Sequence, residues 1–155
     1  MLMLAVGLLT ACHNDQKEVK KVAFGYLNAT GNYRIDEAAP YASKDTRERT
    51  LPFIKNKLIP ITDTNYLKAN VPATITIDSI WFEGDSAWVA YTKTTPIKRL
   101  QNCVSVIRED GKWLVNVPLV LPEAITVGDT SALSITPTNE TYTAPAAPGL
   151  LNKNQ

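Results

Sequence analysis

The chain has 155 residues, of which 45% are hydrophobic and 20% are charged, a balance typical of a globular protein and not of a disordered one. Sixteen basic and fifteen acidic residues leave a formal net charge of +1, so the composition gives no electrostatic reason to expect binding to nucleic acid. The length suits one domain with a sizeable core and argues against a second.

An apolar run, Met1–Leu9, opens the chain. It matches the hydrophobic region of a signal peptide and is shorter than the roughly 20 residues that a membrane-spanning helix needs. It leads into Leu9-Thr10-Ala11-Cys12, which resembles the lipobox of bacterial lipoproteins, although no Lys or Arg precedes it. The resemblance implies cleavage before Cys12 and acylation of that cysteine. We therefore predict a signal peptide over 1–11 and a lipid-anchored tether over 12–16. The alternative is that the apolar run forms an N-terminal helix of the fold.

Lipidation of Cys12 would determine where the protein resides. Acyl chains hold a protein at a bilayer because each buried methylene contributes about 0.8 kcal/mol. His13 stands where an aspartate signals inner-membrane retention under enterobacterial sorting rules, so resemblance to those rules implies the outer membrane. We expect a cell-envelope protein whose domain lies outside the cytoplasm. Cys103 would then lack a partner in the chain, and its apolar surroundings predict a buried, inert thiol.

Helical periodicity follows the leader. Asp15 and Glu18 have the spacing of a capping box, which predicts that a helix begins at Asp15. The apolar stripe of this helix has the spacing i, i+3, i+4, i+7 and i+8 and consists of Val19, Val22, Ala23, Tyr26 and Leu27. Gly31-Asn32 should end the helix, because both residues tolerate the left-handed conformation.

Prolines divide the rest of the helical half. A short helix over 35–39 should stop at Pro40. Pro52 predicts a break just before it, followed by a helical segment over 51–58, because proline fits only the first turn of a helix. Residues 60–72 are expected to form a loop, with room for a single helical turn around Tyr66.

Past Pro72 the pattern changes to alternation. Ile75 and Ile77 share a face of the first strand, but Ile80 follows Ile77 by three residues and not by two or four. Because side chains alternate with a period of two, this spacing predicts a bulge near Asp78-Ser79. Turn residues at 83–86 and 109–112 predict two hairpins. The strands that follow the first one are expected over 87–92, 100–108 and 113–119.

Both faces of the predicted sheet are apolar. The face toward the helices should carry Val89, Tyr91, Val104, Val106, Trp113, Val115 and Val117. The opposite face carries Trp88, Ala90, Ile107 and Leu114. A sheet that is apolar on both sides needs a second cover, for which the C-terminal tail, a partner subunit and a ligand are the alternatives. Helices followed by an antiparallel meander predict an α+β fold, with N-terminal helices on one face of a curved, mainly four-stranded sheet.

A resemblance extends over 17–121. Its segments are Phe24-Gly25-Tyr26-Leu27-Asn28-Ala29, Gly31-Asn32-Tyr33, Ala38, Tyr41-Ala42-Ser43, Glu83-Gly84-Asp85-Ser86-Ala87 and Asp110-Gly111-Lys112-Trp113. They resemble small bacterial lipoproteins, of the Bacteroidetes type and of unknown function, that have a cystatin-like domain, the cone-shaped fold of nuclear transport factor two. The resemblance implies that fold over 17–121 and no catalytic residues. Residues 122–155 are rich in Thr, Pro and Ala, and we expect a partly disordered tail.

Few residues suggest chemistry. The only histidine is His13, so histidine-based catalysis and histidine-rich metal sites are not expected in the domain, and we predict no catalytic residue, metal or cofactor. An isomerase-like enzyme remains the alternative, because related folds use a buried carboxylate beside a tyrosine. Candidate carboxylates and tyrosines are Asp36, Asp78, Glu83, Tyr26, Tyr33 and Tyr41.

The sequence therefore predicts a non-enzymatic binding module for a small apolar ligand or a protein partner, with Tyr26, Tyr41 and Trp88 as pocket lining. A homodimer through the sheet is a further alternative. Two triplets, Asp78-Ser79-Ile80 and Asp85-Ser86-Ala87, resemble sites that some Bacteroidetes O-glycosylate, although bulge and turn chemistry also explains them. Lys93, Lys98 and Arg99 are interpreted as a solvated hairpin end.

Overall fold

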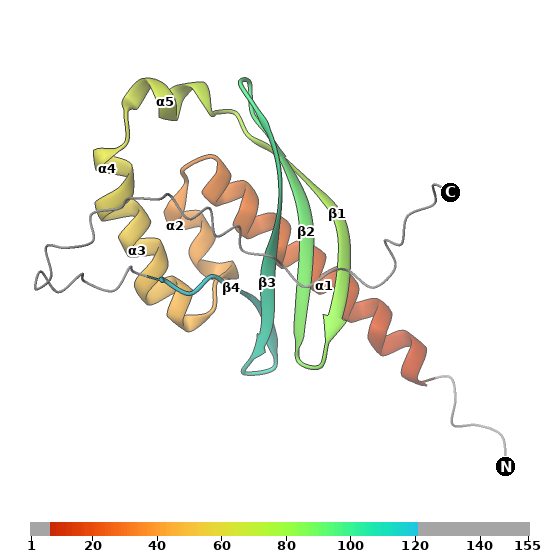
Figure 1. The fold of residues 1–155 in the computed structure, drawn as a ribbon. Helices are drawn as coiled ribbons and strands as arrows, with labels where there is room; N and C mark the ends of the chain where they lie inside the picture. The colour runs from red at the N-terminus through yellow and green to blue at the C-terminus, as the bar shows by residue number, and fades with distance from the viewer. Residues whose placement is uncertain (1–6, 121–155) are drawn as a thin grey trace, which may run out of the picture. The chain divides into compact units, whose positions relative to one another are not determined.

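The computed structural model describes the backbone of residues 7–120 and the side chains of residues 14–120. The predicted tail over 122–155, the side chain of Cys12 and the start of the predicted signal peptide lie outside the described residues. Within them, helical segments precede four strands, and helix α1 packs against the sheet. The predicted α+β class is therefore confirmed (Figure 1).

Helix α1 (Gly7–Gly31) begins earlier than predicted. Asp15 lies inside the helix, so the predicted capping box is wrong. The Oδ1 atom of Asp15 instead accepts hydrogen bonds from Arg108 Nη2 at 2.7 Å and from Trp113 Nε1 at 3.1 Å. The Asp15 carboxylate therefore binds residues that are distant in the sequence and does not cap the helix.

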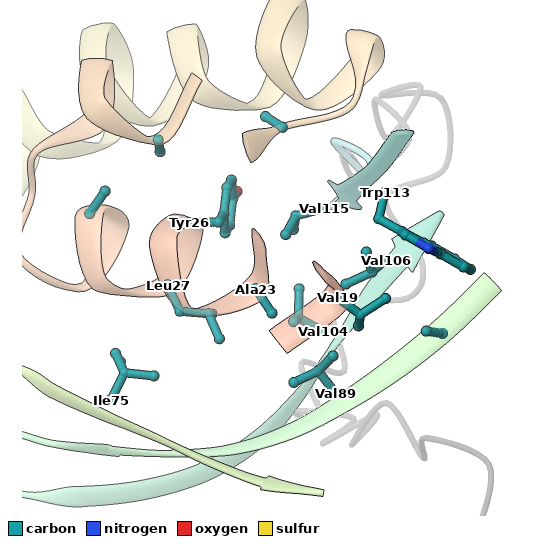
Figure 2. Packing of buried hydrophobic residues seen from close by; sticks show 14 of the residues in the cluster. Val19, Ala23, Tyr26, Leu27, Ile75, Val89, Val104, Val106, Trp113 and Val115 are labelled. Carbon is teal, nitrogen blue, oxygen red and sulfur yellow. The ribbon is translucent and has the colours of Figure 1, made fainter. Parts of the chain in front are cut away.

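The apolar stripe of α1 is buried as predicted, apart from Val22, which is only partly buried. Val19, Ala23 and Leu27 point toward the sheet, and α1 contacts each of the four strands (Figure 2). Burying each large apolar side chain contributes roughly 1.5–3 kcal/mol to stability, so this stripe is the main attachment of the helix.

The short second helix ends near Pro40, as the sequence predicts. Its observed parts are α2 (Ile35–Ala38) and a 3-10 turn, η1 (Ala39–Tyr41).

A third helical stretch runs continuously through Pro52 and Pro60. Its parts are the π turn η2 (Thr46–Thr50), α3 (Leu51–Phe53), the π turn η3 (Ile54–Leu58) and α4 (Ile59–Ile61). In η2 the Leu51 N–H donates to the Thr46 carbonyl, five residues back. Such a wider turn relieves the clash between a proline ring and the carbonyl four residues before it. The predicted break before Pro52 is therefore wrong.

Helix α5 (Thr64–Ala69) occupies much of the stretch that was predicted as loop. Asp63 caps it, with Oδ1 accepting a hydrogen bond from the Tyr66 N–H at 2.9 Å. The turn predicted around Tyr66 is therefore present, but it belongs to a longer helix than predicted, because the Asp63 cap supplies the acceptor that lets the helix begin there.

The four strands form an antiparallel sheet in the order β1-β2-β3-β4. Their bounds are β1 (Thr74–Glu83), β2 (Ser86–Thr94), β3 (Arg99–Glu109) and β4 (Lys112–Asn116). The register of β1 against β2 shifts between Ile77 and Ser79, which confirms the predicted bulge. Gly84 (φ 60°) and Gly111 (φ 75°) lie in the two predicted hairpin turns, where the left-handed conformation favours glycine.

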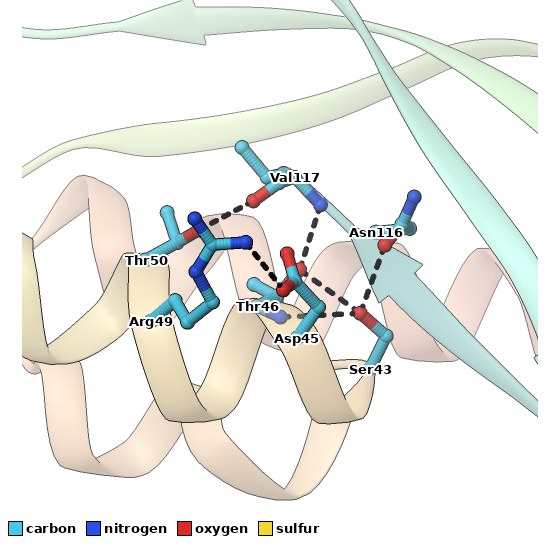
Figure 3. Close-up of polar contacts among 7 residues, drawn as sticks. All are labelled: Ser43, Asp45, Thr46, Arg49, Thr50, Asn116 and Val117. Carbon is cyan, nitrogen blue, oxygen red and sulfur yellow. Dashed lines mark hydrogen bonds and ion pairs between the residues drawn. The ribbon is translucent and has the colours of Figure 1, made fainter. Parts of the chain in front are cut away.

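Strand β4 is shorter than predicted, because its end is bonded to the helices. Ser43, Thr46 and Thr50, here called the β4 clamp, make these bonds (Figure 3). The Ser43 N–H donates to the Val115 carbonyl at 2.8 Å, and Thr46 Oγ1 accepts from the Val117 N–H at 2.8 Å. Thr50 Oγ1 donates to the Val117 carbonyl at 2.6 Å. The β4 clamp thus binds the backbone carbonyl of Val115 and both the N–H and the carbonyl of Val117.

The two faces of the sheet differ in burial. Most of the side chains predicted to face the helices are buried, namely Val89, Val104, Val106, Trp113 and Val115, while Tyr91 and Val117 are partly buried. Trp88, Ala90, Ile107 and Leu114 on the opposite face are half-buried. Cys103 alternates with Val104 and pairs with Ala90, so it also lies on that opposite face and is only half-buried. The predicted full burial of this thiol is wrong, although partial burial does raise its pKa.

Asn32 joins the end of α1 to the start of β1. Its Oδ1 accepts from the Ala73 N–H at 2.8 Å and its Nδ2 donates to the Ala73 carbonyl at 3.0 Å, so the amide substitutes for a neighbouring strand. Helix α1 ends at Gly31, as predicted. The residue in the left-handed conformation is Tyr33, with φ 59°, and not Gly31 or Asn32, for which the sequence predicted it.

Replacing Asn32 with alanine should lower the free energy of unfolding by about 2 kcal/mol, because both polar groups of Ala73 lose their partner. Urea denaturation followed by circular dichroism measures this. Asn65→Ala is the matched control, since Asn65 is exposed in α5. An Asn32→Ala loss no larger than that of the control would contradict the role given to this amide.

Candidate functional site

The three side chains predicted to line a pocket do not meet. Tyr26 is only 4% exposed and belongs to the core, where burial raises the pKa of its phenol to about 12. Tyr41 is half-buried beside α1, and Trp88 lies on the opposite face of the sheet. These three residues therefore do not share one pocket, because alternation along β2 turns Trp88 away from the helices.

Tyr41 does line a groove, at the surface between α1 and α2. Its ring crosses α1 at Gly25, where an added Cβ atom would lie 2.5 Å from the ring carbon Cζ. The groove has a volume of about 500 Å³, and its polar lining includes Arg34 and Glu37, which form an ion pair at 2.8 Å. The groove is shallow and its one carboxylate is already paired.

Two of the three carboxylates considered for an isomerase, Asp36 and Asp78, have other partners, and the third, Glu83, lies exposed beside the β1–β2 turn. Asp36 binds Lys55 at 2.6 Å, and Asp78 accepts a hydrogen bond from Thr92 at 2.8 Å. Between residues 14 and 120 no hydrogen bond joins a carboxylate to a tyrosine hydroxyl, and no three His, Cys, Asp or Glu side chains are grouped as a metal site would require. No helix in that part of the chain is long and apolar enough to cross a bilayer.

One group of tyrosine and lysine side chains does gather outside the core. We call Tyr33, Tyr66, Lys93 and Lys98 the Tyr–Lys cluster. Tyr33 follows α1, Tyr66 lies in α5, and the two lysines flank the turn between β2 and β3. Three segments that are distant in the sequence thus meet at one end of the domain.

Local structure holds each member of the cluster in place. The left-handed Tyr33 directs the chain out of α1, and the Asp63 cap fixes the first turn of α5, which carries Tyr66. The Lys93 side chain passes Gly31, with Cε 3.7 Å from the point that a Cβ atom would occupy. The Thr95 N–H donates to the Lys98 carbonyl at 2.8 Å and closes the hairpin.

The lysines contact the tyrosines directly. Lys98 Nζ donates to Tyr66 Oη at 2.5 Å and lies 4.9 Å from the centre of the Tyr66 ring. Lys93 Nζ lies 5.9 Å from the centre of the Tyr33 ring. Lys98 is therefore bound at the hydroxyl end of Tyr66, whereas the Lys93 ammonium lies over the Tyr33 ring, an attraction worth about 0.5–1 kcal/mol at an exposed site.

Burial and the Lys98 ammonium both shift pKa values in the cluster. The hydrogen bond from Lys98 lowers the pKa of the Tyr66 phenol. Partial burial, and then the charge of Lys98, lower the pKa of Lys93. Burial raises the pKa of Tyr33. Among residues 14–120 the ion pairs involve other cations, and neither lysine of the cluster binds an Asp or Glu. The arrangement can hold an anionic group between two ammoniums and a phenol.

Sequence reasoning missed this cluster. Lys93 and Lys98 were interpreted as a solvated hairpin end, and Tyr33 was considered only for an isomerase. The signal that could have identified them is weak, because two lysines around a turn are common and the tyrosines lie in other segments. Comparisons with protein-family models, with curated proteins and with solved structures find no match to this chain, so the cluster is judged on its geometry alone.

Proposed function

We propose that this chain is a lipid-anchored cell-envelope protein whose α+β domain is a non-enzymatic binding module. The observation that carries the anchor is Leu9-Thr10-Ala11-Cys12, placed directly after an apolar run and before a charged segment. The proposed relationship to small lipoproteins with a cystatin-like domain is supported by the order of the elements, in which helices precede a four-stranded meander.

The binding function belongs on the outside of the domain. Val19, Val89 and Val106 are each 0% exposed, so side chains fill the space between α1 and the sheet (Figure 2). A small apolar ligand would have to displace this core, which is packed as densely as an organic crystal. We therefore favour a protein partner over a small apolar ligand. The carboxylate–tyrosine pair that an isomerase needs is not formed among residues 14–120.

Replacing Cys12 with alanine tests the anchor. The full chain is expressed in a bacterium that processes lipoproteins and is labelled with an alkyne-tagged fatty acid. We expect the Cys12→Ala variant to lose the label and to leave the membrane fraction. Cys103→Ala is the control, because it removes the other thiol and should retain both properties. Acyl labelling that survives Cys12→Ala would disprove the proposed anchor.

A further inference from the structure

The Tyr–Lys cluster lies at the end of α1 that is remote from Cys12. Along the helix, Cys12 and Gly31 are separated by about 28 Å at 1.5 Å per residue. Asp15, one turn from Cys12, is held by Arg108 and Trp113. The β1–β2 and β3–β4 turns lie near the first turns of α1, whereas the β2–β3 hairpin and α5 lie near its other end (Figure 1). On a protein anchored through Cys12, the cluster would therefore face away from the bilayer.

Charge makes the cluster receptive to an anion. Two ammoniums share one surface, and the charge of Lys98 adds to partial burial in lowering the pKa of Lys93. A carboxylate placed between them would offset that repulsion and form charge-assisted hydrogen bonds, which are about twice as strong as neutral ones. The phenol of Tyr66 already accepts from Lys98, so its own hydrogen remains available to donate to the same carboxylate.

The surroundings of the cluster favour a peptide over a sugar polymer. Ile97 and Leu100 lie on the same hairpin and are 56% and 47% exposed. Aliphatic and tyrosine side chains beside cations are typical of protein interfaces. Sugar rings usually stack on free aromatic faces, and one face of the Tyr33 ring is already occupied by the Lys93 ammonium.

We propose that the Tyr–Lys cluster, together with Ile97 and Leu100, binds an acidic peptide segment of a protein partner. Carboxylates of the segment lie between Lys93 and Lys98, and its aliphatic side chains pack on Ile97 and Leu100. This inference deepens the proposed binding function by naming the kind of partner and the surface that takes it. The position away from the bilayer leaves that surface accessible to a second protein.

The test uses the full chain and a fluorescein-labelled synthetic peptide of glutamate and leucine, with fluorescence anisotropy as the readout. We expect the double variant Lys93→Gln/Lys98→Gln to raise the Kd about tenfold, since both partners of the carboxylates are lost. The matched control is Lys57→Gln/Lys112→Gln, which removes the same charge from exposed lysines elsewhere. It should change the Kd less than about twofold at physiological salt. Equal weakening in both double variants, or an unchanged Kd in the first, overturns the proposal.

Further arms separate the alternatives. Urea denaturation of the Lys93→Gln/Lys98→Gln variant shows whether it remains folded. Leu100→Gln is a second variant. We expect it to weaken binding of the glutamate–leucine peptide and to leave binding of acetylated polyglutamate unchanged. Polygalacturonate that binds more tightly than the peptide would overturn the peptide assignment. Cys12→Ala should bind the peptide normally, so loss of the anchor and loss of the binding site are distinguished.

Discussion

Replacing Trp113 with alanine is expected to lower the free energy of unfolding by about 4 kcal/mol, as truncation of a buried aromatic residue usually does. The Trp113 side chain is 4% exposed. Its ring centre lies 5.7 Å from that of Phe82, the Arg108 guanidinium lies 4.7 Å from the ring centre, and Nε1 donates to Asp15. Because a domain of this size is stable by only about 5–15 kcal/mol, this single change should leave it marginal.

Urea denaturation monitored by far-UV circular dichroism measures the loss. Trp81→Ala is the control, because Trp81 is also a strand tryptophan but is only partly buried in β1. Trp113→Phe is a milder change, since it retains a buried aromatic ring and removes the hydrogen bond to Asp15 together with part of the ring volume. We expect that variant to lose about 1 kcal/mol. Similar losses for Trp113→Ala and Trp81→Ala would show that the contacts of Trp113 are energetically unimportant.

The second large effect is expected from Thr46 in the β4 clamp. Thr46 is 0% exposed, accepts a hydrogen bond from the Val117 N–H and contacts Ser43 Oγ at 3.0 Å. Thr46→Val retains the volume but leaves that N–H without its acceptor, which should cost about 2–3 kcal/mol. The measurement is again urea denaturation, now combined with hydrogen exchange at the Val117 amide, which should lose its protection.

Thr76→Val is the control for this prediction, because Thr76 is an exposed threonine in β1 and valine is favoured in strands. A Ser43→Ala/Thr46→Val double variant should lose less than the sum of the two single changes, since the two hydroxyls belong to one network. Strict additivity would mean that the two side chains act independently.

The sheet was the most predictable part of the fold. Side-chain alternation is a local signal, so the bulge after Ile77 and the turns at Gly84 and Gly111 could be located from the sequence. The end of β4 could not, because it depends on hydroxyls of Thr46 and Thr50 that are distant in the chain.

The helical half was less predictable for a similar reason. A capping box was inferred from Asp15, but Arg108 and Trp113 determine what this carboxylate does. Pro52 normally indicates a break, and the preceding π turn removes the clash on which that rule rests. The candidate site was the least predictable part, because Tyr33 and Tyr66 meet the two lysines only in the folded chain.

The two edges of the sheet are unequal, and this limits how the protein can self-associate. The β4 edge is occupied at Val115 and Val117 by the β4 clamp, whereas among residues 7–120 β1 has no neighbouring strand on its outer side. Strand β4 pairs only with residues 105–109 of β3, so within the same part of the chain the first half of β3 has no strand on that side either. The bulge between Ile77 and Ser79 interrupts the β1 edge. The clamp therefore blocks strand addition at the end of β4 and leaves β1 and the first half of β3 as the stretches along which a second copy could pair.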